Sequence, residues 1–512
     1  PKLFNGRPIQ TSELGRMDRT HFAHILVPER ADHPERSHAT LERVIEVLDN
    51  VLGDQAAAHI QRLKDRLDIE ERAPLTREQA YTVADIIDEA ALPHTAVREI
   101  TRQLEASEIA TAEAEELHQQ YKTPVSALEE DIVPVRGDGC WIRDTKGDWY
   151  LDMDSNYSAT NLGMANEELA KGLYNQAKLL VSMKEDRVQI ARTRFLREIK
   201  QMLPPGLEHF YWQNSGGEAV DKCIKFAKAY TGTKDVIAFK NGFHGRTHGA
   251  VAVTWNEDYR RPFHLHEEDW VHFADFNDIE SVRQIMDETG ARIIIMEMVQ
   301  GEEAGNLPAT QQFIDDLWQL AEERDAVIID DEVQAGFGRT ATREGDWFAC
   351  QSYNVTPDIM AIGKSFGGGY PVTAVVTTKE ISNAMQPGWD GSTFGGNPMA
   401  MTAALIATRQ MRRRDITQNV IDRAEQMRDG FNKLQKKHPI MEDIHGRGLM
   451  LAFSLGSPEN VEALQHHLRE QHVKSTLSTG EYIRFLPPTI ISPGEVSFFL
   501  DRLDKALSHL TC

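Results

Sequence analysis

Short apolar runs alternate with helical patterns through the middle of the chain, between residues 180 and 415. Each run precedes a turn or a helical pattern, and the runs occupy residues 235–240, 249–254, 292–299, 326–331, 358–362 and 373–378. Continuous apolar runs of this length are typical of strands that a parallel sheet buries on both faces. The pattern predicts an α/β fold with a mostly parallel sheet sandwiched by helices.

The regions that flank this part predict a smaller α+β domain. Residues 140–152 form two short strand patterns around a Lys-Gly-Asp turn, which indicates a β-hairpin. We expect this hairpin to join the last part of the chain, so that residues 126–180 and 416–512 together make a small domain. Residues 181–415 then form the large domain.

Residues 1–125 carry helical patterns that predict an N-terminal extension. Ser37 can cap a first helix, which Gly53 closes, and Thr76 can cap a second. Further helical patterns continue to residue 121. We expect a helical module that packs on a dimer or shields the entrance of an active site.

The composition limits the partners of the protein. With 512 residues the chain is too long for one compact core, so two or three domains are expected. The 79 acidic residues outnumber the 56 lysines and arginines and give a net charge of −23. Because an acidic chain repels nucleic acid and anionic membranes, we expect neither as a partner.

The four cysteines, Cys140, Cys223, Cys350 and Cys512, lie far apart in the sequence and form no metal-ligand spacing. We therefore expect no bound metal, and the low cysteine density fits a reducing cytoplasm. The chain shows no apolar signal region at its start and no run long enough to span a membrane. These features predict a soluble, cytoplasmic protein.

Lys364 stands directly after an apolar run and before a glycine-rich turn. A lysine at the end of a buried strand is desolvated, which favours the neutral amine and makes it a nucleophile towards an aldehyde. The sequence Gly363-Lys364-Ser365 could also belong to a phosphate-binding P-loop. That loop needs a glycine five positions before Gly363, where this chain has Asp358, so the nucleotide-hydrolase hypothesis is excluded.

Two other segments carry candidate chemistry. The run 326–331 ends in acids, which places carboxylates at the carboxyl end of a buried strand. Residues 214–220 open a helical pattern with Ser215, Gly216 and Gly217, whose backbone N–H groups can bind an anion. Ser215 can equally be an ordinary helix cap.

Taken together and in this order, these segments resemble the class III aminotransferases, which are pyridoxal-phosphate (PLP) enzymes of fold type I. The resemblance covers about residues 125–512. It implies that Lys364 bonds covalently to the cofactor aldehyde and later carries the substrate's proton. It also implies that Asp331 pairs with the pyridine nitrogen and keeps it protonated, so that the ring can accept electrons. Whether Glu332 does more than brace the strand end stays open.

The same resemblance assigns further cofactor contacts. Phe243 and His244 belong to the motif whose aromatic residue stacks on the cofactor ring. Gln334 matches a glutamine next to the phenolic oxygen of the cofactor. Ser215 and its two glycines match the phosphate loop; many relatives carry Ser or Thr where this chain has Gly217, which removes a hydroxyl contact but keeps the backbone donors.

Thr393 matches a threonine that reaches the phosphate held by the neighbouring subunit, which implies a homodimer with shared active sites. Glu302 and Arg484 match an acid–arginine pair that works as a switch. There the arginine binds the α-carboxylate of glutamate, then turns to the acid when a substrate without that carboxylate enters. Arg246 matches a second carboxylate-binding arginine, and Tyr157 falls where a substrate-lining residue of the small domain stands. A plain salt bridge and a plain packing tyrosine are the structural alternatives.

The sequence therefore predicts a PLP-dependent aminotransferase with a ping-pong mechanism. Its donor is expected to be glutamate, and its acceptor a terminal aldehyde or ketone of an amino-acid semialdehyde or a larger biosynthetic intermediate. An aminomutase, racemase or decarboxylase of the same fold would share every cofactor residue. A non-catalytic PLP-binding regulator that uses the N-terminal helices for interaction is the third hypothesis.

Overall fold

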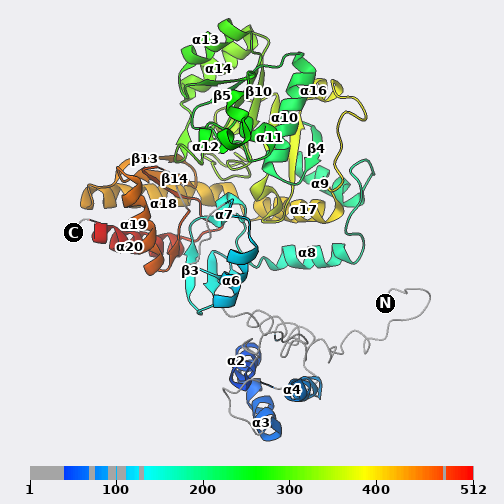
Figure 1. Cartoon of the computed structure of the whole chain (residues 1–512), viewed down its shortest axis with the longest axis vertical. Coiled ribbons are helices and arrows are strands. Elements are labelled where there is room, and N and C mark those ends of the chain that lie inside the picture. Colours follow the sequence, from blue (N-terminus) through cyan, green and yellow to red (C-terminus); the bar gives the residue numbers. More distant parts are fainter. Residues whose placement is uncertain are drawn as a thin grey trace. The chain divides into compact units, whose positions relative to one another are not determined.

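The computed structural model describes residues 40–67, 75, 77–89, 100, 111–125, 132–476 and 480–510. The chain divides into two compact units (Figure 1). One comprises Pro1–Val135 with Asp144–Gly147, and the other comprises Arg136–Arg143 with Asp148–Cys512. The domain boundaries expected at residues 125, 180 and 415 stay predictions.

The described stretches of the first unit up to residue 121 are mainly helical, as the sequence predicts. They form α2 (Leu41–Leu52), η1 (Gly53–Gln55), α3 (Ala56–Leu67), α4 (Arg77–Glu89) and α6 (Thr111–Tyr121). The cap of α2 is Thr40, whose hydroxyl accepts the N–H of Arg43 at 3.2 Å, and Gly53 closes the helix with a φ of 54°. The proposed caps Ser37 and Thr76 lie outside the described residues. Leu48, Leu63 and Val83 belong to a hydrophobic core within this unit.

A seven-stranded sheet forms the centre of the second unit, in the order β4-β12-β11-β10-β7-β5-β6. Its strands are β4 (His209–Gln213), β5 (Val236–Phe239), β6 (Val271–Ala274), β7 (Ile293–Met296), β10 (Val327–Asp331), β11 (Ile359–Ile362) and β12 (Thr373–Thr377). Only β12 runs antiparallel to its neighbours in this sheet. The predicted α/β fold with a mostly parallel sheet is therefore confirmed.

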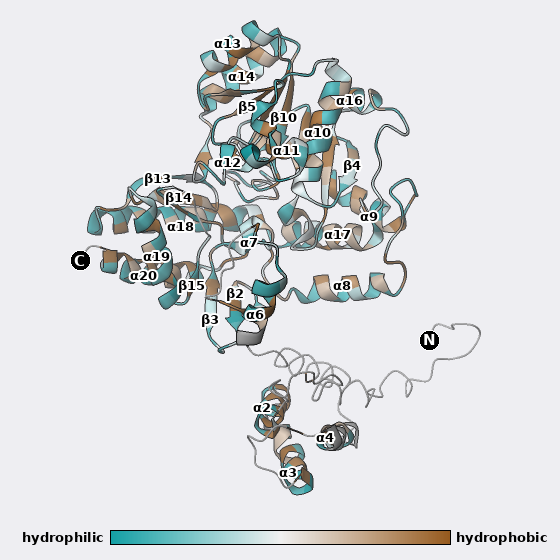
Figure 2. Ribbon diagram, in the orientation of Figure 1, coloured by the Kyte–Doolittle hydropathy of each residue, from teal (hydrophilic) through white to brown (hydrophobic). Residues whose placement is uncertain are grey.

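Alternation along the strands explains why helices cover both faces of this sheet. Ile293 and Ile295 belong to one hydrophobic cluster, with α10 (Gly216–Thr231), while Ile294 and Met296 belong to another, with α13 (Ile279–Thr289) and α14 (Gln311–Glu323). Successive side chains of a strand point to opposite faces, so an unbroken apolar run needs cover on both. Figure 2 shows the strands as brown ribbons between helices that carry both teal and brown positions.

One predicted strand is wrong. Residues 249–254 begin within the helix α11 (His248–Ala252), which follows Thr247 as its cap residue. Gly249 and Ala250 are small enough for α11 to pack closely on α10, because a Cβ at Gly249 would lie 2.6 Å from Asp221 Oδ1. The sequence also missed β4 and β6, whose half-buried residues give no continuous apolar run.

The small-domain regions contain two further sheets. One orders β1 (Pro134–Asp138), β2 (Trp141–Asp144), β3 (Trp149–Asp152) and β15 (Val473–Lys474) side by side. The predicted hairpin is confirmed, since β2 pairs antiparallel with β3, and β15 pairs in parallel with β3. The other sheet is antiparallel, in the order β13 (Glu442–Arg447), β14 (Met450–Ser454) and β16 (Tyr482–Phe485).

Helices and short elements complete the second unit. The longer helices are α8 (Glu167–Ala177), α9 (Ile190–Ile199), α17 (Pro398–Arg413), α18 (Ile416–Lys437), α19 (Pro458–Glu470) and α20 (Pro493–Leu510). The short elements are α7 (Ser155–Ser158), α12 (Glu257–Arg260), η2 (Arg261–Phe263), η3 (Leu265–Glu267), β8 (Val299–Gln300), β9 (Leu307–Pro308), α15 (Ala349–Ser352), η4 (Lys364–Gly367) and α16 (Lys379–Asn383). Among the described residues, no helix combines the length and the apolar character that crossing a bilayer requires.

Four phenylalanines hold α18 and α20 against the small antiparallel sheet. The ring of Phe431, on α18, lies 5.4 Å from Phe453, 5.8 Å from Phe485 and 6.2 Å from Phe499, measured between ring centroids. All four rings are buried. Because Phe485 follows a site residue on β16, this cluster also fixes the position of that strand.

We expect Phe431→Ala to lower the free energy of unfolding by about 3–5 kcal/mol, since it removes a ring from the centre of the cluster and leaves a cavity. Urea denaturation followed by tryptophan fluorescence measures the change. Phe263→Ala is the control, because that ring is 64 % exposed and its loss should change stability by less than about 0.5 kcal/mol. Equal losses in the two variants would contradict the proposed cluster.

Candidate active site

Four of the predicted site segments converge at the carboxyl edge of the large sheet. Asp331 ends β10, Lys364 follows β11, Phe243 and His244 follow β5, and the glycines of α10 follow β4. A cavity of about 240 Å³ opens there. It is lined by Gly216, Gly217, Phe243, His244, Gly245, Arg246, Glu297, Glu302, Asp331, Val333, Gln334 and Lys364.

Two partners fix the carboxylate of Asp331. His244 Nδ1 lies 2.8 Å from Asp331 Oδ2, and the N–H of Val333 donates to Asp331 Oδ1 at 3.1 Å. Burial alone would lower the pKa of His244, but the hydrogen bond and the charge of Asp331 raise it above its ordinary value. His244 therefore orients the carboxylate of Asp331 through its Nδ1. Within the described residues, the other ring nitrogen, Nε2, has no hydrogen-bond partner.

Lys364 begins η4 directly after the strand β11, with a φ of 45°. Burial lowers the pKa of its amine, as the sequence predicts for a lysine at a strand end. The neighbouring Arg484 lowers the pKa further, while Glu302 and Asp331 raise it. The net effect favours the neutral amine more than at an ordinary surface lysine.

The start of α10 presents backbone donors to the cavity. Ser215 caps the helix, and Glu218 completes a capping box by accepting the N–H groups of Asn214 and Ser215 at 2.9 and 2.8 Å. The Ser215 side chain is exposed, and its predicted cofactor contact stays a prediction. Gly216 and Gly217 line the cavity, and a helix offers no internal partner to its first N–H groups. This end can therefore hold an anion.

The side chain of Thr247 leaves no room for a side chain at Gly217. A Cβ at this position would lie 2.9 Å from the hydroxyl of Thr247 and 3.2 Å from its methyl group. The absence of a side chain at this position is thus matched by a threonine packed against the same loop. The hydroxyl oxygen of Thr247 is buried and, in the described part of the chain, accepts and donates no hydrogen bond.

Arg484 and Glu302 form the predicted ion pair. Arg484 Nη2, on β16, lies 3.1 Å from Glu302 Oε2. The Arg484 side chain is 1 % exposed and that of Glu302 is 22 % exposed. The pair borders the cavity that holds Lys364, because Glu302 is part of its lining.

Arg246 lies on the exposed side of the cavity. Its guanidinium stacks on the ring of Tyr259, 3.6 Å from the centroid, and lies 5.4 Å from the centroid of Phe243. Planar guanidinium groups favour this arrangement over aromatic faces. Stacking leaves the edge of the guanidinium available for a carboxylate.

Gln334 Nε2 donates to the carbonyl of Tyr157 at 3.3 Å, but Tyr157 itself is not among the residues that line the cavity. Gln334 lines the cavity, as expected of a cofactor contact. Thr393 is exposed on the loop between α16 and α17 and is not part of the cavity lining within one chain. This position agrees with a contact to another subunit, which stays a prediction.

The backbone around Tyr157 is strained. Ser155, Asn156, Tyr157 and Ser158 have φ values of 47°, 52°, 54° and 75°. Left-handed backbone costs an L-residue roughly 1–2 kcal/mol, and none of the four is glycine. The N–H groups of Ser155 and Tyr157 are capped by Asp152 and Asp154, at 3.0 and 2.9 Å.

Three cavity residues, Gly245, Glu297 and Val333, were not identified as site residues from the sequence. Glu297 follows β7, and its carboxylate accepts the N–H of Phe243 at 2.8 Å and that of Gly301 at 3.3 Å. Burial raises the pKa of Glu297 to about 7. An acid after a buried strand was the available signal, as it was for Asp331. Val333 gave no comparable signal, and it packs against Gly216 and Gly363.

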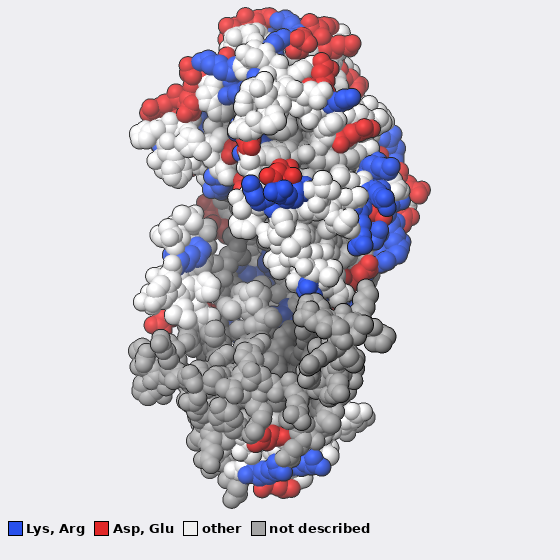
Figure 3. Space-filling view, turned by 90° about the vertical axis from the view of Figure 1, so that its right-hand side faces the viewer, with Lys and Arg blue, Asp and Glu red and all other residues white. Residues whose placement is uncertain are grey.

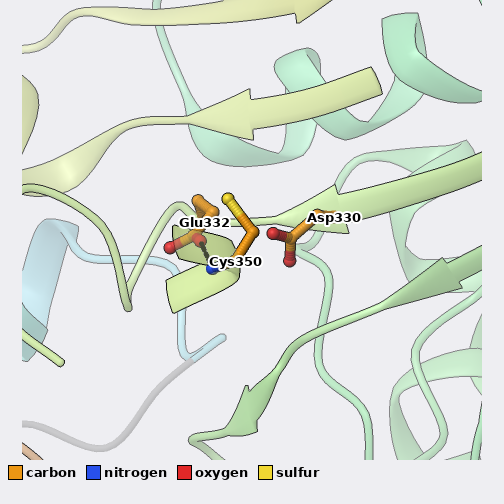
Figure 4. A group of neighbouring side chains, drawn as sticks. All are labelled: Asp330, Glu332 and Cys350. Atoms are coloured by element: carbon orange, nitrogen blue, oxygen red, sulfur yellow. Dashed lines mark hydrogen bonds between the residues drawn. The ribbon is translucent and has the colours of Figure 1, made fainter. Parts of the chain in front are cut away.

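The acids on either side of Asp331 point away from the cavity. Asp330 and Glu332 lie fully buried with Cys350 (Figure 4), and their acidic oxygens and the sulfur lie within 4.8 Å of one another. The carboxylate of Glu332 accepts the N–H of Cys350 at 3.0 Å, so Glu332 braces the strand end, the simpler of its two possible roles. Burial and the neighbouring Glu332 raise the pKa of Asp330 well above its ordinary value.

The part of the chain that contains these site segments is similar to known proteins. Residues 123–507 match the model of the family described as aminotransferase class-III. The [LysW]-aminoadipate semialdehyde transaminase of Deinococcus radiodurans is 33 % identical over 383 residues, covering 74 % of this chain and 87 % of that protein. The acetylornithine aminotransferase of Archaeoglobus fulgidus is 35 % identical over 365 residues, covering 71 % of this chain and 92 % of that protein.

Solved structures agree with the fold. The ornithine aminotransferase of Toxoplasma gondii superposes with a TM-score of 0.73 at 24 % identity, over 79 % of this chain and 96 % of that one. The N-acetylornithine aminotransferase of Stenotrophomonas maltophilia superposes with a TM-score of 0.65 at 26 % identity, over 77 % of this chain and 99 % of that one. Most of the N-terminal unit precedes the family match, which begins at residue 123.

We expect stability to fall with rising pH because of Asp330. The folded protein holds this proton more tightly than the unfolded chain, whose aspartates titrate near 3.8. The contribution of Asp330 to the free energy of unfolding is fully present below about pH 3.8, where both states are protonated. It is lost as the pH rises through the higher pKa of Asp330 in the folded protein. Asp330→Asn keeps the shape without the titration, so its free energy of unfolding should decline less between pH 4 and about pH 8.

Thermal unfolding across this pH range measures the effect. Asp422→Asn provides the control, because that carboxylate is half exposed on α18 and should leave the pH slope unchanged. A slope in Asp330→Asn as steep as in the unmodified protein would show that Asp330 is ionised in the folded state.

Proposed function

This chain belongs to the class III aminotransferases, and we propose that it moves an amino group from glutamate to a terminal aldehyde or ketone. The acceptor is an amino-acid semialdehyde or a larger biosynthetic intermediate. The enzyme is a PLP-dependent transaminase of fold type I. Because donor and acceptor use one cavity in turn, the reaction follows a ping-pong order.

The cavity offers a group for each part of PLP. Asp331 would pair with the pyridine nitrogen, the N–H groups of Gly216 and Gly217 would bind the phosphate, and Phe243 would lie against the ring. Lys364 would bond to the aldehyde. The fixed carboxylate of Asp331 supports this fit, because two hydrogen bonds orient it before any ligand arrives. When bound, PLP supplies a ring that accepts electrons from the substrate carbon.

Lys364 would carry the proton in both half reactions. A base works best when its pKa lies near the working pH, and burial lowers that of Lys364 towards this range. Its Nζ can then take the proton from the donor carbon and return it at the site of amination. The charges of Glu302 and Asp331 raise the pKa of this amine and partly oppose the effect of burial.

The Arg484–Glu302 pair is the observation that carries the choice of glutamate. A guanidinium this deeply buried needs an anion, and Glu302 supplies it when the cavity holds no α-carboxylate. The α-carboxylate of glutamate can replace the carboxylate of Glu302 as the partner of Arg484. Of the two side chains in this ion pair, that of Glu302 is the more exposed. An acceptor without an α-carboxylate at this position leaves the pair closed.

Two observations support a semialdehyde as acceptor. Arg246 offers a guanidinium edge on the exposed side of the cavity, suited to a carboxylate at the far end of the substrate. The relative from D. radiodurans is named for a semialdehyde, and the relative from A. fulgidus for acetylornithine, whose terminal amine is what amino transfer to a terminal aldehyde produces. Tyr157 contacts the lining residue Gln334 through its carbonyl, and we keep it as the proposed contact to the acceptor from α7.

We further propose a homodimer with shared active sites. Apolar side chains at Leu179, Val181, Val188 and Ile190 are between 57 and 97 % exposed, and Phe394 beside Thr393 is 59 % exposed. Arg192 bonds to the carbonyls of Glu185 and Gly396, so these two segments lie side by side. Such a patch is typical of a protein interface. The face that carries α9 and α16 shows broad uncharged areas between intermingled acidic and basic groups (Figure 3).

A cytoplasmic location fits the cysteines. Cys140, Cys223 and Cys350 are buried and unpaired in the described structure. Free buried thiols are usual where the surroundings are reducing. We propose the cytoplasm as the working compartment on this ground.

Mixing the PLP-loaded enzyme with glutamate should shift the cofactor absorbance to that of pyridoxamine phosphate and release 2-oxoglutarate in equal amount. A stopped-flow spectrum and an assay for the keto acid measure the two products. An aminomutase, racemase or decarboxylase would release no 2-oxoglutarate, and a non-catalytic binder would show neither change. Lys364→Ala should abolish the reaction, and turnover in that variant would refute the proposed proton carrier.

Arg484→Lys should lower kcat/KM for glutamate by about 100-fold, because the ammonium loses bidentate carboxylate binding. The rate with an amine donor that has no α-carboxylate should change by less than about threefold. Steady-state kinetics with the two donors separate the effects. Arg409→Lys, a surface arginine paired with Glu198, is the matched control. Equal losses with both donors would remove the support for glutamate.

Mixing Lys364→Ala subunits with Thr393→Ala subunits tests the shared site. If Thr393 serves the neighbouring subunit, a mixed dimer has one intact site, and random pairing restores about a quarter of full activity. Activity after subunit exchange, beyond that of each variant alone, measures the recovery. Additive activities without recovery would place Thr393 in its own chain's site.

A further inference from the structure

Arg339 is a fully buried arginine that the proposed reaction does not use. It lies on the loop after β10, at 0 % exposure, and contacts no carboxylate among the described residues. Burial lowers the pKa of its guanidinium to about 9, although Asp154 and Asp152 nearby raise it. A buried charge without a carboxylate in contact is unfavourable, so the hydrogen bonds of this guanidinium must compensate for its burial.

The guanidinium of Arg339 joins the strained turn of α7 to two segments next to the strands β14 and β16. Its Nε donates to Ser158 Oγ at 2.8 Å, and its Nη2 donates to Ser155 Oγ at 3.2 Å. Its Nη1 donates to the carbonyls of Leu449, at 3.3 Å, and Pro487. Three nitrogens thus reach three separate segments, which the forked shape of arginine allows and the single ammonium of lysine does not.

The turn held in this way contacts both sides of the cavity. The carbonyl of Ser158 accepts from Ser365 Oγ at 2.7 Å, and Ser365 is the residue after Lys364. The carbonyl of Tyr157 accepts from Gln334 Nε2 at 3.3 Å, and Ser158 Oγ donates to the carbonyl of Gln334 at 3.1 Å. The two contacts made by the carbonyls of Tyr157 and Ser158 depend on the left-handed backbone, because these carbonyls point elsewhere in the ordinary right-handed conformation.

We propose that Arg339 is a positioning residue for the transamination. By holding residues 155–158 in their left-handed conformation, it keeps Lys364 and Gln334 in place against the cofactor. The proposal rests on the proposed function for its reaction, but the geometry it describes exists in the chain itself. Arg339 touches neither cofactor nor substrate and acts through Ser155 and Ser158.

Arg339→Lys tests the proposal, because it keeps a buried cation and removes the fork. We expect the single-turnover rate with glutamate to fall about 10- to 100-fold with KM changed by less than about threefold, since misplacing a catalytic group by about 1 Å has such an effect. PLP should also dissociate several-fold faster. Ser158→Ala keeps Arg339 and should show the same changes at a smaller size.

Arg428→Lys is the matched control. Arg428 is half-buried on α18, and its Nη2 donates to the carbonyl of Gly446, away from the turn. Its substitution should lower thermal stability while leaving turnover rate and PLP release within about twofold of the unmodified enzyme. Comparable stability losses in Arg339→Lys and Arg428→Lys with unequal rates then separate positioning from folding.

PLP release and the pH dependence of the cofactor's visible absorbance give readouts that need no amino donor. If the unmodified enzyme fails to release 2-oxoglutarate from glutamate, the proposed function is wrong, and these two measurements still test Arg339. Wild-type PLP release and an unchanged absorbance titration in both Arg339→Lys and Ser158→Ala would overturn the positioning role. So would equal rate losses in Arg339→Lys and Arg428→Lys.

Discussion

Side-chain alternation along one buried strand sets the roles of three consecutive acids. At the end of β10 the chain places Asp331 into the cavity and sends Asp330 and Glu332 to the opposite side. One strand thus carries a fixed carboxylate for chemistry on one face and a buried acidic group that braces the structure on the other. A shift of register by one residue would exchange these two environments and destroy both.

The cavity combines acids and bases so that each side chain depends on its neighbours. Asp331 raises the pKa of His244 against the effect of burial, burial together with Arg484 lowers that of Lys364, and burial raises that of Glu297. The donors and acceptors come from the ends of different strands, which the sheet holds at fixed spacing. Such an arrangement is stable before any ligand enters, because the cost of orienting the charges is met when the protein folds.

Most of the residues that line the cavity could be predicted from the sequence, because each follows a buried strand or opens a helix within a few residues. Lys364, Asp331 and Gly216 were visible in this local way. The partnership of His244 with Asp331 was not, since 87 residues separate them in the chain. The left-handed turn was equally hidden, because a Ser-Asn-Tyr-Ser segment contains no glycine to mark positive φ.

The error at residues 249–254 has the same physical origin. A short apolar run suits a buried strand and a buried helix equally well, and only close packing of Gly249 against α10 decides between them. Similarly, the importance of Arg339 depends on carbonyls contributed by distant parts of the chain. Local pattern identifies the groups that carry chemistry, whereas the groups that hold them are defined by tertiary contact.

The pairing of β15 with β3 has a consequence for synthesis of the protein. Lys474 bonds to Asp154 and lies 3.9 Å from Asp152, yet it follows them by more than 300 residues. While the chain leaves the ribosome, β3 has an open edge and its two acids lack their cation until residue 474 emerges. The sheet of β1, β2, β3 and β15 is therefore completed late in synthesis, and until then the open edge of β3 can pair with another molecule.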